Sequence, residues 1–201
     1  MRKLKEVFVC QNCGAASPKW QGQCAACGEW NTLVAETAPS GVRHAKPGSP
    51  RAARADSSTS LAAEAVAEQP RMATGSAELD RVLGGGLVVG SVTLIGGDPG
   101  IGKSTLMLQV AAALNTMGPV LYATGEESLK QVALRGRRLG LKDAAARLIA
   151  ETGVQDIVAA ASALPALALI VDSIQTMRSD HVDAAPGAVS QLRECTAELV
   201  R

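Results

Sequence analysis

Aromatic residues are nearly missing from this sequence, which has two tryptophans, one tyrosine and one phenylalanine among 201 residues. Beyond residue 70 the only aromatic residue is Tyr122, so that part of the chain offers no platform on which the bases of single-stranded nucleic acid can stack. Hydrophobic residues nevertheless make up 47% of the chain, which is enough to bury a core, and the composition is that of a globular protein.

An excess of either charge is missing as well. The net charge is +1, so the overall balance does not demand a polyanionic partner, and nucleic acid binding has to be argued from motifs. No apolar run reaches the roughly 18 residues of a membrane span, and the basic N-terminus is followed by no apolar run of signal-peptide length. We therefore expect a soluble, cytoplasmic protein with no membrane partner.

Cysteine is sparse and unevenly placed, because four of the five cysteines form two C-x-x-C pairs that lie ten residues apart. This spacing is typical of a metal site rather than of a disulfide framework, and it favours a reducing compartment. Four thiolates without a nearby histidine or carboxylate leave no open coordination position, which predicts a structural Zn²⁺ and not a catalytic one. The predicted zinc ligands are Cys10, Cys13, Cys24 and Cys27.

A module of about 30 residues cannot bury enough surface to fold alone, so the metal has to supply most of its folding free energy. We expect Phe8, Trp20 and Trp30 to form the small apolar core of this module. The alternative, in which one tryptophan is exposed and stacks on a base or a partner, stays open. The fifth cysteine, Cys195, is expected to be a small, half-buried helix residue rather than a reactive thiol.

The composition changes twice along the chain and predicts three parts. The middle stretch contains no aromatic residue and is rich in Ala, Ser, Pro and Arg, which is typical of a flexible linker. The predicted parts are a zinc finger over residues 1–35, a linker over 36–70 and a larger domain over 71–201.

The third part alternates short β-branched runs with helical segments of 10 to 15 residues. This pattern predicts an α/β fold with a mainly parallel sheet and helices on both of its faces. Two capping-box spacings, Ser128 with Gln131 and Thr152 with Gln155, predict helices that begin near Leu129 and Gly153. A further helix is expected over 104–118, and strands are expected over 91–97, 119–125, 147–151 and 167–173.

Residues 97–104 read GDPGIGKS and satisfy the pattern G-x-x-x-x-G-K-[ST] between an expected strand and an expected helix. Glycines let the backbone N–H groups wrap a phosphate, Lys103 can reach the β- and γ-phosphates, and the Ser104 hydroxyl can ligate Mg²⁺. The sequence thus predicts a P-loop for ATP with Mg²⁺. Its binding residues are Gly97, Asp98, Pro99, Gly100, Ile101, Gly102, Lys103, Ser104 and Thr105.

Acidic residues follow two of the expected strands and complete an ATP-hydrolysing set. Asp172 ends an apolar strand, so its carboxylate should emerge beside the P-loop and hold the Mg²⁺ water shell. Glu126 and Glu127 follow the strand over 119–125, and either one can polarise the attacking water or simply favour the start of the next helix. We expect Lys103, Asp172 and one of these two glutamates to be catalytic.

These stretches together resemble one family closely, the bacterial RadA (Sms) family of RecA-like ATPases. The resemblance covers about residues 5–35 and 71–201 and rests on five stretches. It implies a RecA-like P-loop core behind a four-Cys zinc finger, and it assigns the water-activating role to Glu126 rather than Glu127. The stretches are FVCQNCGAASPKWQGQCAACGEWNT, TGSAELDRVLGGGLVVGS, LIGGDPGIGKSTL, LYATGEESLKQVALRGRRLGL and IVDSIQTM.

The resemblance also implies an activity and partners. Members of the family hydrolyse ATP in response to single-stranded or branched DNA, and they branch-migrate recombination intermediates as a hexameric ring that works with a RecA-type recombinase. The family continues past the position of Arg201 with the rest of the sheet, a Lys-Asn-Arg-Phe-Gly motif and a Lon-protease-like domain. We therefore expect a truncated chain that binds nucleotide but turns it over poorly, since the site in such rings is completed by a neighbouring subunit.

Two other interpretations stay open. In one, the zinc finger is a DNA-binding or protein-binding module and the ATPase half does not function. In the other, the chain is a RecA-like regulatory ATPase. This interpretation accounts for the P-loop but not for the four cysteines.

Overall fold

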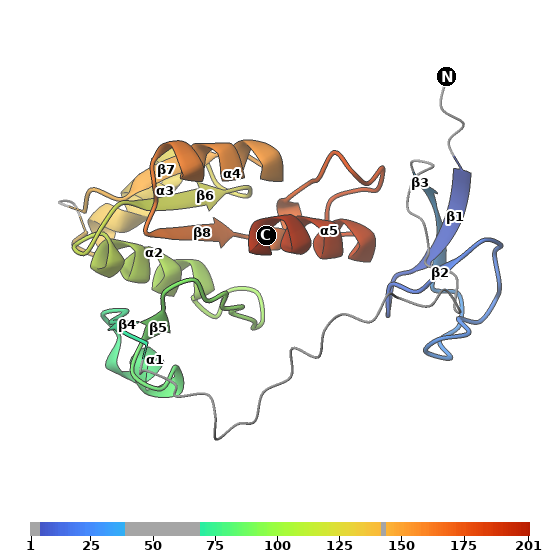
Figure 1. Ribbon diagram of the computed structural model, residues 1–201, viewed down its shortest axis with the longest axis horizontal. Helices are drawn as coiled ribbons and strands as arrows, with labels where there is room; N and C mark the ends of the chain where they lie inside the picture. The colour runs from blue at the N-terminus through green and yellow to red at the C-terminus, as the bar shows by residue number, and fades with distance from the viewer. Residues whose placement is uncertain (1–4, 39–68, 142–143) are drawn as a thin grey trace, which may run out of the picture.

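The computed structural model describes residues 5–38, 69–141 and 144–201 (Figure 1). Most of the predicted linker 36–70 therefore lies outside the described residues. The N-terminal part is a three-stranded antiparallel sheet in the order β2-β1-β3. Its strands are β1 (Lys5–Cys10), β2 (Ala16–Ser17) and β3 (Leu33–Ala38), so strand structure continues three residues beyond the expected end of the finger.

The core of this small sheet differs from the expected one. Cys10, Cys24 and Leu33 are buried together, and Phe8 packs against them. Trp20 and Trp30 are 56% and 66% exposed, so the prediction that both indoles form the core is wrong. The sulfur cluster and one leucine already occupy the small interior, which leaves the indoles outside it.

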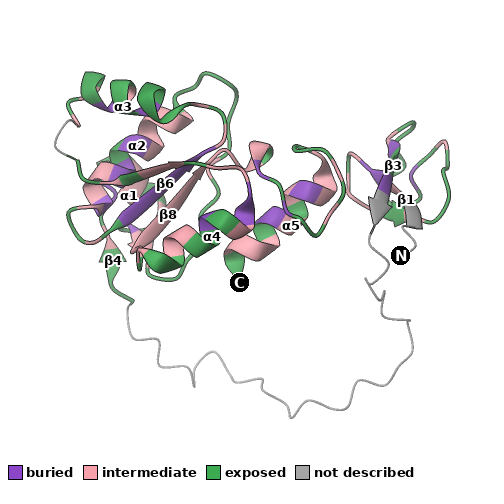
Figure 2. Cartoon of the chain, turned by 90° about the horizontal axis from the view of Figure 1, so that it is seen from above, coloured by how far each residue is buried: buried purple, intermediate pink, exposed green. Residues whose placement is uncertain are grey.

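The larger part contains a parallel sheet, as the sequence predicts, and its strands are in the order β7-β6-β8. Strand β6 is buried along its whole length, while the outer strand β8 is only partly buried (Figure 2). A short antiparallel pair, β4 and β5, lies before it in the chain. The strands are β4 (Arg71–Met72), β5 (Leu87–Val88), β6 (Val120–Thr124), β7 (Arg147–Ala150) and β8 (Ala168–Asp172).

Helices cover both faces of the parallel sheet, and alternate strand residues separate the two layers. Tyr122 faces a core made with α2 and α3, whereas its neighbour Ala123 faces a core made with α4 and α5. This arrangement confirms the predicted α/β class. The helices are α1 (Ala77–Val82), α2 (Lys103–Leu114), α3 (Leu129–Arg138), α4 (Val154–Ala163), the 3₁₀ turn η1 (Ile174–Thr176) and α5 (Val189–Val200).

The expected strand over 91–97 is not formed. Val92 and Leu94 in this segment are 64% and 84% exposed, and no ladder hydrogen bond joins the segment to the described strands. β-branched residues favour a strand only when a neighbouring strand supplies the ladder and the packing. Strand β8 correspondingly pairs with β6 alone, which explains why it is only half-buried rather than buried as expected.

The two predicted helix starts have different caps. Helix α3 has the complete capping box of Ser128 and Gln131 that the sequence predicts. Helix α4 does not, because Gly153 is its N-cap and Oε1 of Glu151 accepts from the backbone N–H groups of Thr152 and Gly153 at 2.7 and 2.8 Å. These two hydrogen bonds lower the pKa of the Glu151 carboxyl, and the one from Gly153 contributes most.

Helix α5 joins the two parts of the chain. Arg193 donates to the backbone carbonyls of Cys13 and Gly14 at 2.7 and 2.9 Å, and Ser190 donates to the buried Glu36 at 2.5 Å. The opposite side of the helix buries Cys195 completely, so this thiol is more deeply buried than expected, and burial raises its pKa to about 11. Across the described ranges, none of the helices has the length and apolar character needed to span a bilayer.

Candidate functional site

The four predicted zinc ligands come together at the end of the small sheet. Strand β1 delivers Cys10 at its last position, paired with Leu33 of β3, and the turn that follows brings Cys13 back beside it. The four Sγ atoms all lie within 4.8 Å of one another, although the first and last of these cysteines, Cys10 and Cys27, are 17 positions apart in the sequence.

The sulfur spacing fits a tetrahedral metal. Cys10 Sγ and Cys27 Sγ lie 3.7 Å apart, and Cys13 Sγ and Cys24 Sγ lie 3.6 Å apart. Ligands at about 2.3 Å from a tetrahedral Zn²⁺ are separated by about 3.8 Å, so both distances match such an ion. A hydrogen bond with the Thr32 hydroxyl, 3.1 Å from Cys10 Sγ, lowers the pKa of the Cys10 thiol.

The glycine-rich loop lies at the start of α2 and is exposed. Gly97, Gly100 and Gly102 all have positive φ, between 80° and 158°, and added Cβ atoms at Gly100 and Gly102 would point into open space. Helix α2 begins without a side-chain cap and without an acidic residue in its first turn, so its first N–H groups remain available to an anion. The loop therefore has the open backbone that a phosphate requires.

Lys103 turns back over this loop. Its ammonium group donates to the carbonyls of Gly97 and Asp98 at 2.7 and 2.8 Å, and both contacts are exposed. Ser104 and Thr105 follow on α2 and are half-buried. Figure 1 shows α2 beginning on the side of the sheet toward which β8 points, so the loop and the C-terminal end of β8 share one side of the molecule.

Asp172 is the last residue of β8 and its carboxylate is already engaged. Oδ2 of Asp172 accepts a hydrogen bond of 2.5 Å from the hydroxyl of Tyr122 in β6. Tyr122 is fully buried. Its burial, and to a smaller extent this hydrogen bond, raise the pKa of its hydroxyl. The hydroxyl therefore remains a donor at neutral pH.

The two glutamates after β6 have different partners. Glu126 is exposed and accepts a 2.6 Å hydrogen bond from the hydroxyl of Ser173, the residue that follows Asp172. Glu127 instead forms an ion pair with Arg135 of α3. Arg135 is thus committed to a carboxylate, whereas its neighbours Arg137 and Arg138 are exposed, as expected for a solvated helix face.

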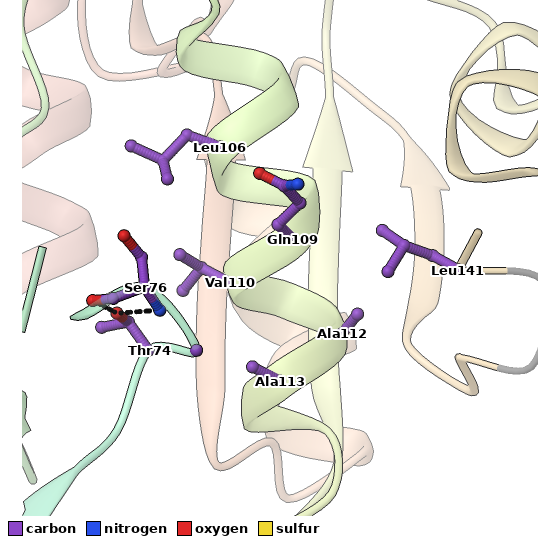
Figure 3. A pocket seen from close by; sticks show the side chains of 9 residues that line it. Thr74, Ser76, Leu106, Gln109, Val110, Ala112, Ala113 and Leu141 are labelled. Atoms are coloured by element: carbon purple, nitrogen blue, oxygen red, sulfur yellow. Dashed lines mark hydrogen bonds between the residues drawn. The ribbon is translucent and has the colours of Figure 1, made fainter. Parts of the chain in front are cut away.

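Two hollows open on the larger part of the chain. The smaller one, of about 320 Å³, opens at the C-terminal ends of β6 and β7, and it is lined by Thr124, Gly125, Glu126, Glu127, Ala150, Glu151 and Thr152. The larger one, of about 570 Å³, runs along the side of α2 between Ser76 and Leu141 (Figure 3). No charged side chain and no residue of the glycine-rich loop lines the larger hollow, so it is not a phosphate site.

Sequence reasoning missed the hydroxyl partners of the two carboxylates. Tyr122 was expected only as a buried strand residue, and Ser173 only as the end of a strand. A signal for Ser173 exists in the sequence, since the segments TGE and VDS each follow an expected strand and parallel strands end at the same edge of a sheet. The contact of Tyr122 depends on the register of the two strands.

Comparisons with known proteins agree with both parts of the chain. Residues 8–35 match the family described as a rubredoxin metal binding domain, a zinc ribbon, and residues 72–146 match the KaiC family of ATPases. The chain is 51% identical over 204 residues to a protein named DNA repair protein RadA from Pseudomonas aeruginosa, which covers 100% of this chain and 44% of that protein.

Similar proteins of the same name occur in distant bacteria. The identity is 47% over 205 residues to that of Bacillus subtilis and 44% over 204 residues to that of Escherichia coli, covering 100% and 98% of this chain. The chain spans 44% of the length of each of these relatives.

Proposed function

This chain belongs to the RadA family of bacterial DNA repair proteins, and from that premise we propose that its residues carry the zinc ribbon and the ATP site of a DNA-dependent ATPase. One observation carries the proposal. Glu126 accepts a hydrogen bond from the hydroxyl of Ser173, the residue that follows Asp172 at the end of β8, on the side where the glycine-rich loop opens α2.

Each group in this site has a role that its chemistry supports. The loop from Gly97 to Thr105 binds the phosphates through backbone N–H groups, and Lys103 exchanges its two carbonyl contacts for phosphate oxygens. Ser104 and Asp172 would hold Mg²⁺, which when bound supplies positive charge at the β- and γ-phosphates. Glu126 orients and deprotonates the attacking water.

The hydrogen bonds support Glu126 over Glu127 for this last role. Glu126 is exposed and linked to the residue beside Asp172, whereas Glu127 is held by Arg135 away from that link. The Glu127 carboxylate is thus engaged by a guanidinium, whereas Glu126 accepts only from a neutral hydroxyl.

The wider activity follows from the family. We infer ATP hydrolysis stimulated by single-stranded or branched DNA, branch migration of recombination intermediates, a hexameric ring, and cooperation with a RecA-type recombinase. A cytoplasmic location fits a chain whose four thiolates have to stay reduced to bind zinc. A monomer of these 201 residues should bind ATP and hydrolyse it slowly, because the neighbouring subunit of a ring completes the site.

The decisive experiment compares Glu126→Gln with Glu127→Gln in a single-turnover assay with radiolabelled ATP. Glu126→Gln is expected to lower the rate of hydrolysis at least about 100-fold, since it removes the base and keeps the size of the side chain. Glu127→Gln should stay within about threefold of the parent protein. Both variants should bind ATP normally.

The reverse ranking of the two variants would transfer the role to Glu127. Loss of nucleotide binding in Glu126→Gln would mean that this side chain supports the fold or the ligand and not the chemistry.

A second function is favoured by the exposed tryptophans of the zinc ribbon. Both indoles lie within 4 Å of where a Cβ of Gly22 would be, so they flank one glycine on the surface, and the exposed Lys19 directly precedes Trp20 in the chain. Exposed aromatic rings with an adjacent cation form a stacking surface for the bases of single-stranded DNA. We propose that the ribbon is the part of this chain that contacts DNA.

Tryptophan emission tests this contact directly, because both tryptophans of the chain lie in the ribbon. An oligothymidylate should quench the emission saturably, and Trp20→Leu should weaken its binding about 10-fold. Leu134→Ala, which removes an exposed apolar side chain from α3, is the matched control and should bind DNA normally. Unquenched emission at saturating oligonucleotide would refute a stacking role.

A further inference from the structure

Tyr122 occupies a position at which packing alone does not require a hydroxyl. It is the only tyrosine of the chain, it lies in the middle of β6, and it is fully buried in the core that α2 and α3 build on one face of the sheet. Phenylalanine would fill the same space. The hydroxyl is nevertheless satisfied, since it donates to Asp172 Oδ2 at 2.5 Å.

The sheet register explains how this contact arises. Tyr122 pairs with Ile170 and Thr124 pairs with Asp172, so Tyr122 and Asp172 lie on the same face of neighbouring strands in a diagonal relation. A diagonal pair is too far apart for short side chains but within reach of a long aromatic one. The tyrosine therefore spans from the core to the carboxyl end of β8.

We propose that Tyr122 is a positioning residue for Asp172, which it holds through Oδ2 so that the carboxylate is fixed for the magnesium of a bound nucleotide. This inference rests on the proposed ATP site and adds a residue to it. Within the described residues Oδ1 of Asp172 accepts no hydrogen bond, so the tyrosine occupies one oxygen and leaves the other for a metal-bound water. A hydroxyl donor to a carboxylate forms a strong, directional hydrogen bond.

A purely structural role explains the contact less well. Strands β6 and β8 are already joined by five residue pairs of parallel ladder, so one more hydrogen bond adds little to their association. The same edge repeats the arrangement, since Ser173 holds Glu126 as Tyr122 holds Asp172. Each carboxylate assigned to the reaction thus receives one hydroxyl from the neighbouring strand.

The test measures the magnesium dependence of nucleotide binding by the whole chain, with a fluorescent, non-hydrolysable ATP analogue as the probe. Tyr122→Phe should raise the Mg²⁺ concentration for half-maximal binding about 10-fold. Its affinity for the analogue in EDTA should stay within about twofold of the parent protein, since the loop and Lys103 are untouched. An equal loss of affinity with and without Mg²⁺, or no loss at all, overturns the proposal.

A double-mutant cycle separates this inference from the proposed function. In an Asp172→Asn background, Tyr122→Phe should shift the Mg²⁺ requirement by less than about twofold, because the carboxylate that it positions is absent. If the parent protein binds the analogue equally well with and without Mg²⁺, the proposed magnesium site fails and this inference fails with it. If the parent protein needs Mg²⁺ and Tyr122→Phe does not alter that need, only the positioning role fails.

A second measurement does not depend on whether Tyr122→Phe folds. Because the chain has one tyrosine, a protein labelled with ¹³C at tyrosine Cζ gives one signal from Tyr122. This signal should move when Mg²⁺ is added to the parent protein with bound analogue, and it should not respond in Asp172→Asn. An identical response in both proteins would contradict the proposal.

Discussion

Removal of zinc is expected to unfold residues 5–38 while the parallel sheet and its helices stay folded. Apart from the sulfurs, the buried cluster of the ribbon contains Leu33, with Phe8 and Ala15 packed against it, because both tryptophans lie outside it. So small a core cannot offset the conformational entropy of about 30 ordered residues. Zinc binding, worth about 10–16 kcal/mol in comparable modules, has to provide the difference.

The measurement is zinc release to a chelator together with the amide NMR spectrum. The parent protein should contain one zinc per chain, and Cys24→Ser should contain less than a tenth of that and lose the dispersed signals of the ribbon. Cys195→Ser is the matched control, because it changes a buried thiol of α5 that lies outside the metal cluster, and its zinc content should be unchanged. A dispersed ribbon spectrum in the zinc-free protein would show that the fold does not need the metal.

Zinc loss should also disturb the contact between the ribbon and helix α5. Arg193 donates to the carbonyls of Cys13 and Gly14, and these carbonyls keep their positions only while the knuckle is folded. Signals of Arg193 and Ser190 should therefore shift on zinc removal, whereas those of the glycine-rich loop should not.

Local patterns predicted the parts of this molecule that depend on neighbouring residues. The C-x-x-C pairs, the glycine-rich loop before α2 and the capping box of α3 each act over a few positions, and the structure has all three. The parallel strands β6, β7 and β8 also followed from their short apolar runs, although only β6 is buried along its whole length.

Features that depend on distant residues were predicted less well. The segment over 91–97 has strand composition but no partner, and composition alone cannot supply one. The exposure of Trp20 and Trp30 depends on what else fills the ribbon interior, which becomes known only when the sulfur cluster is placed. The bond between Tyr122 and Asp172 joins residues 50 positions apart and requires the register of two strands.

Replacement of Lys103 by alanine is expected to lower the affinity for ATP about 100-fold. Most of this loss comes from the charge-assisted contacts that the lysine makes to the phosphates. The fold should tolerate the change. Both hydrogen bonds of the Lys103 ammonium are exposed and end on loop carbonyls that water can satisfy, and alanine is a good residue for the first turn of α2. The unfolding free energy should change by less than about 1 kcal/mol.

Equilibrium titration with a fluorescent ATP analogue measures the affinity, and thermal unfolding without nucleotide measures the stability. Lys130→Ala is the matched control, since it removes an equally charged, exposed lysine from the first turn of α3. It should bind ATP as the parent protein does, which separates the contact made by Lys103 from a change in net charge. Nucleotide should raise the melting temperature of the parent protein and of Lys130→Ala but not of Lys103→Ala. An affinity of Lys103→Ala within about threefold of the parent value would show that Lys103, the only cation of the glycine-rich loop, does not contact the phosphates.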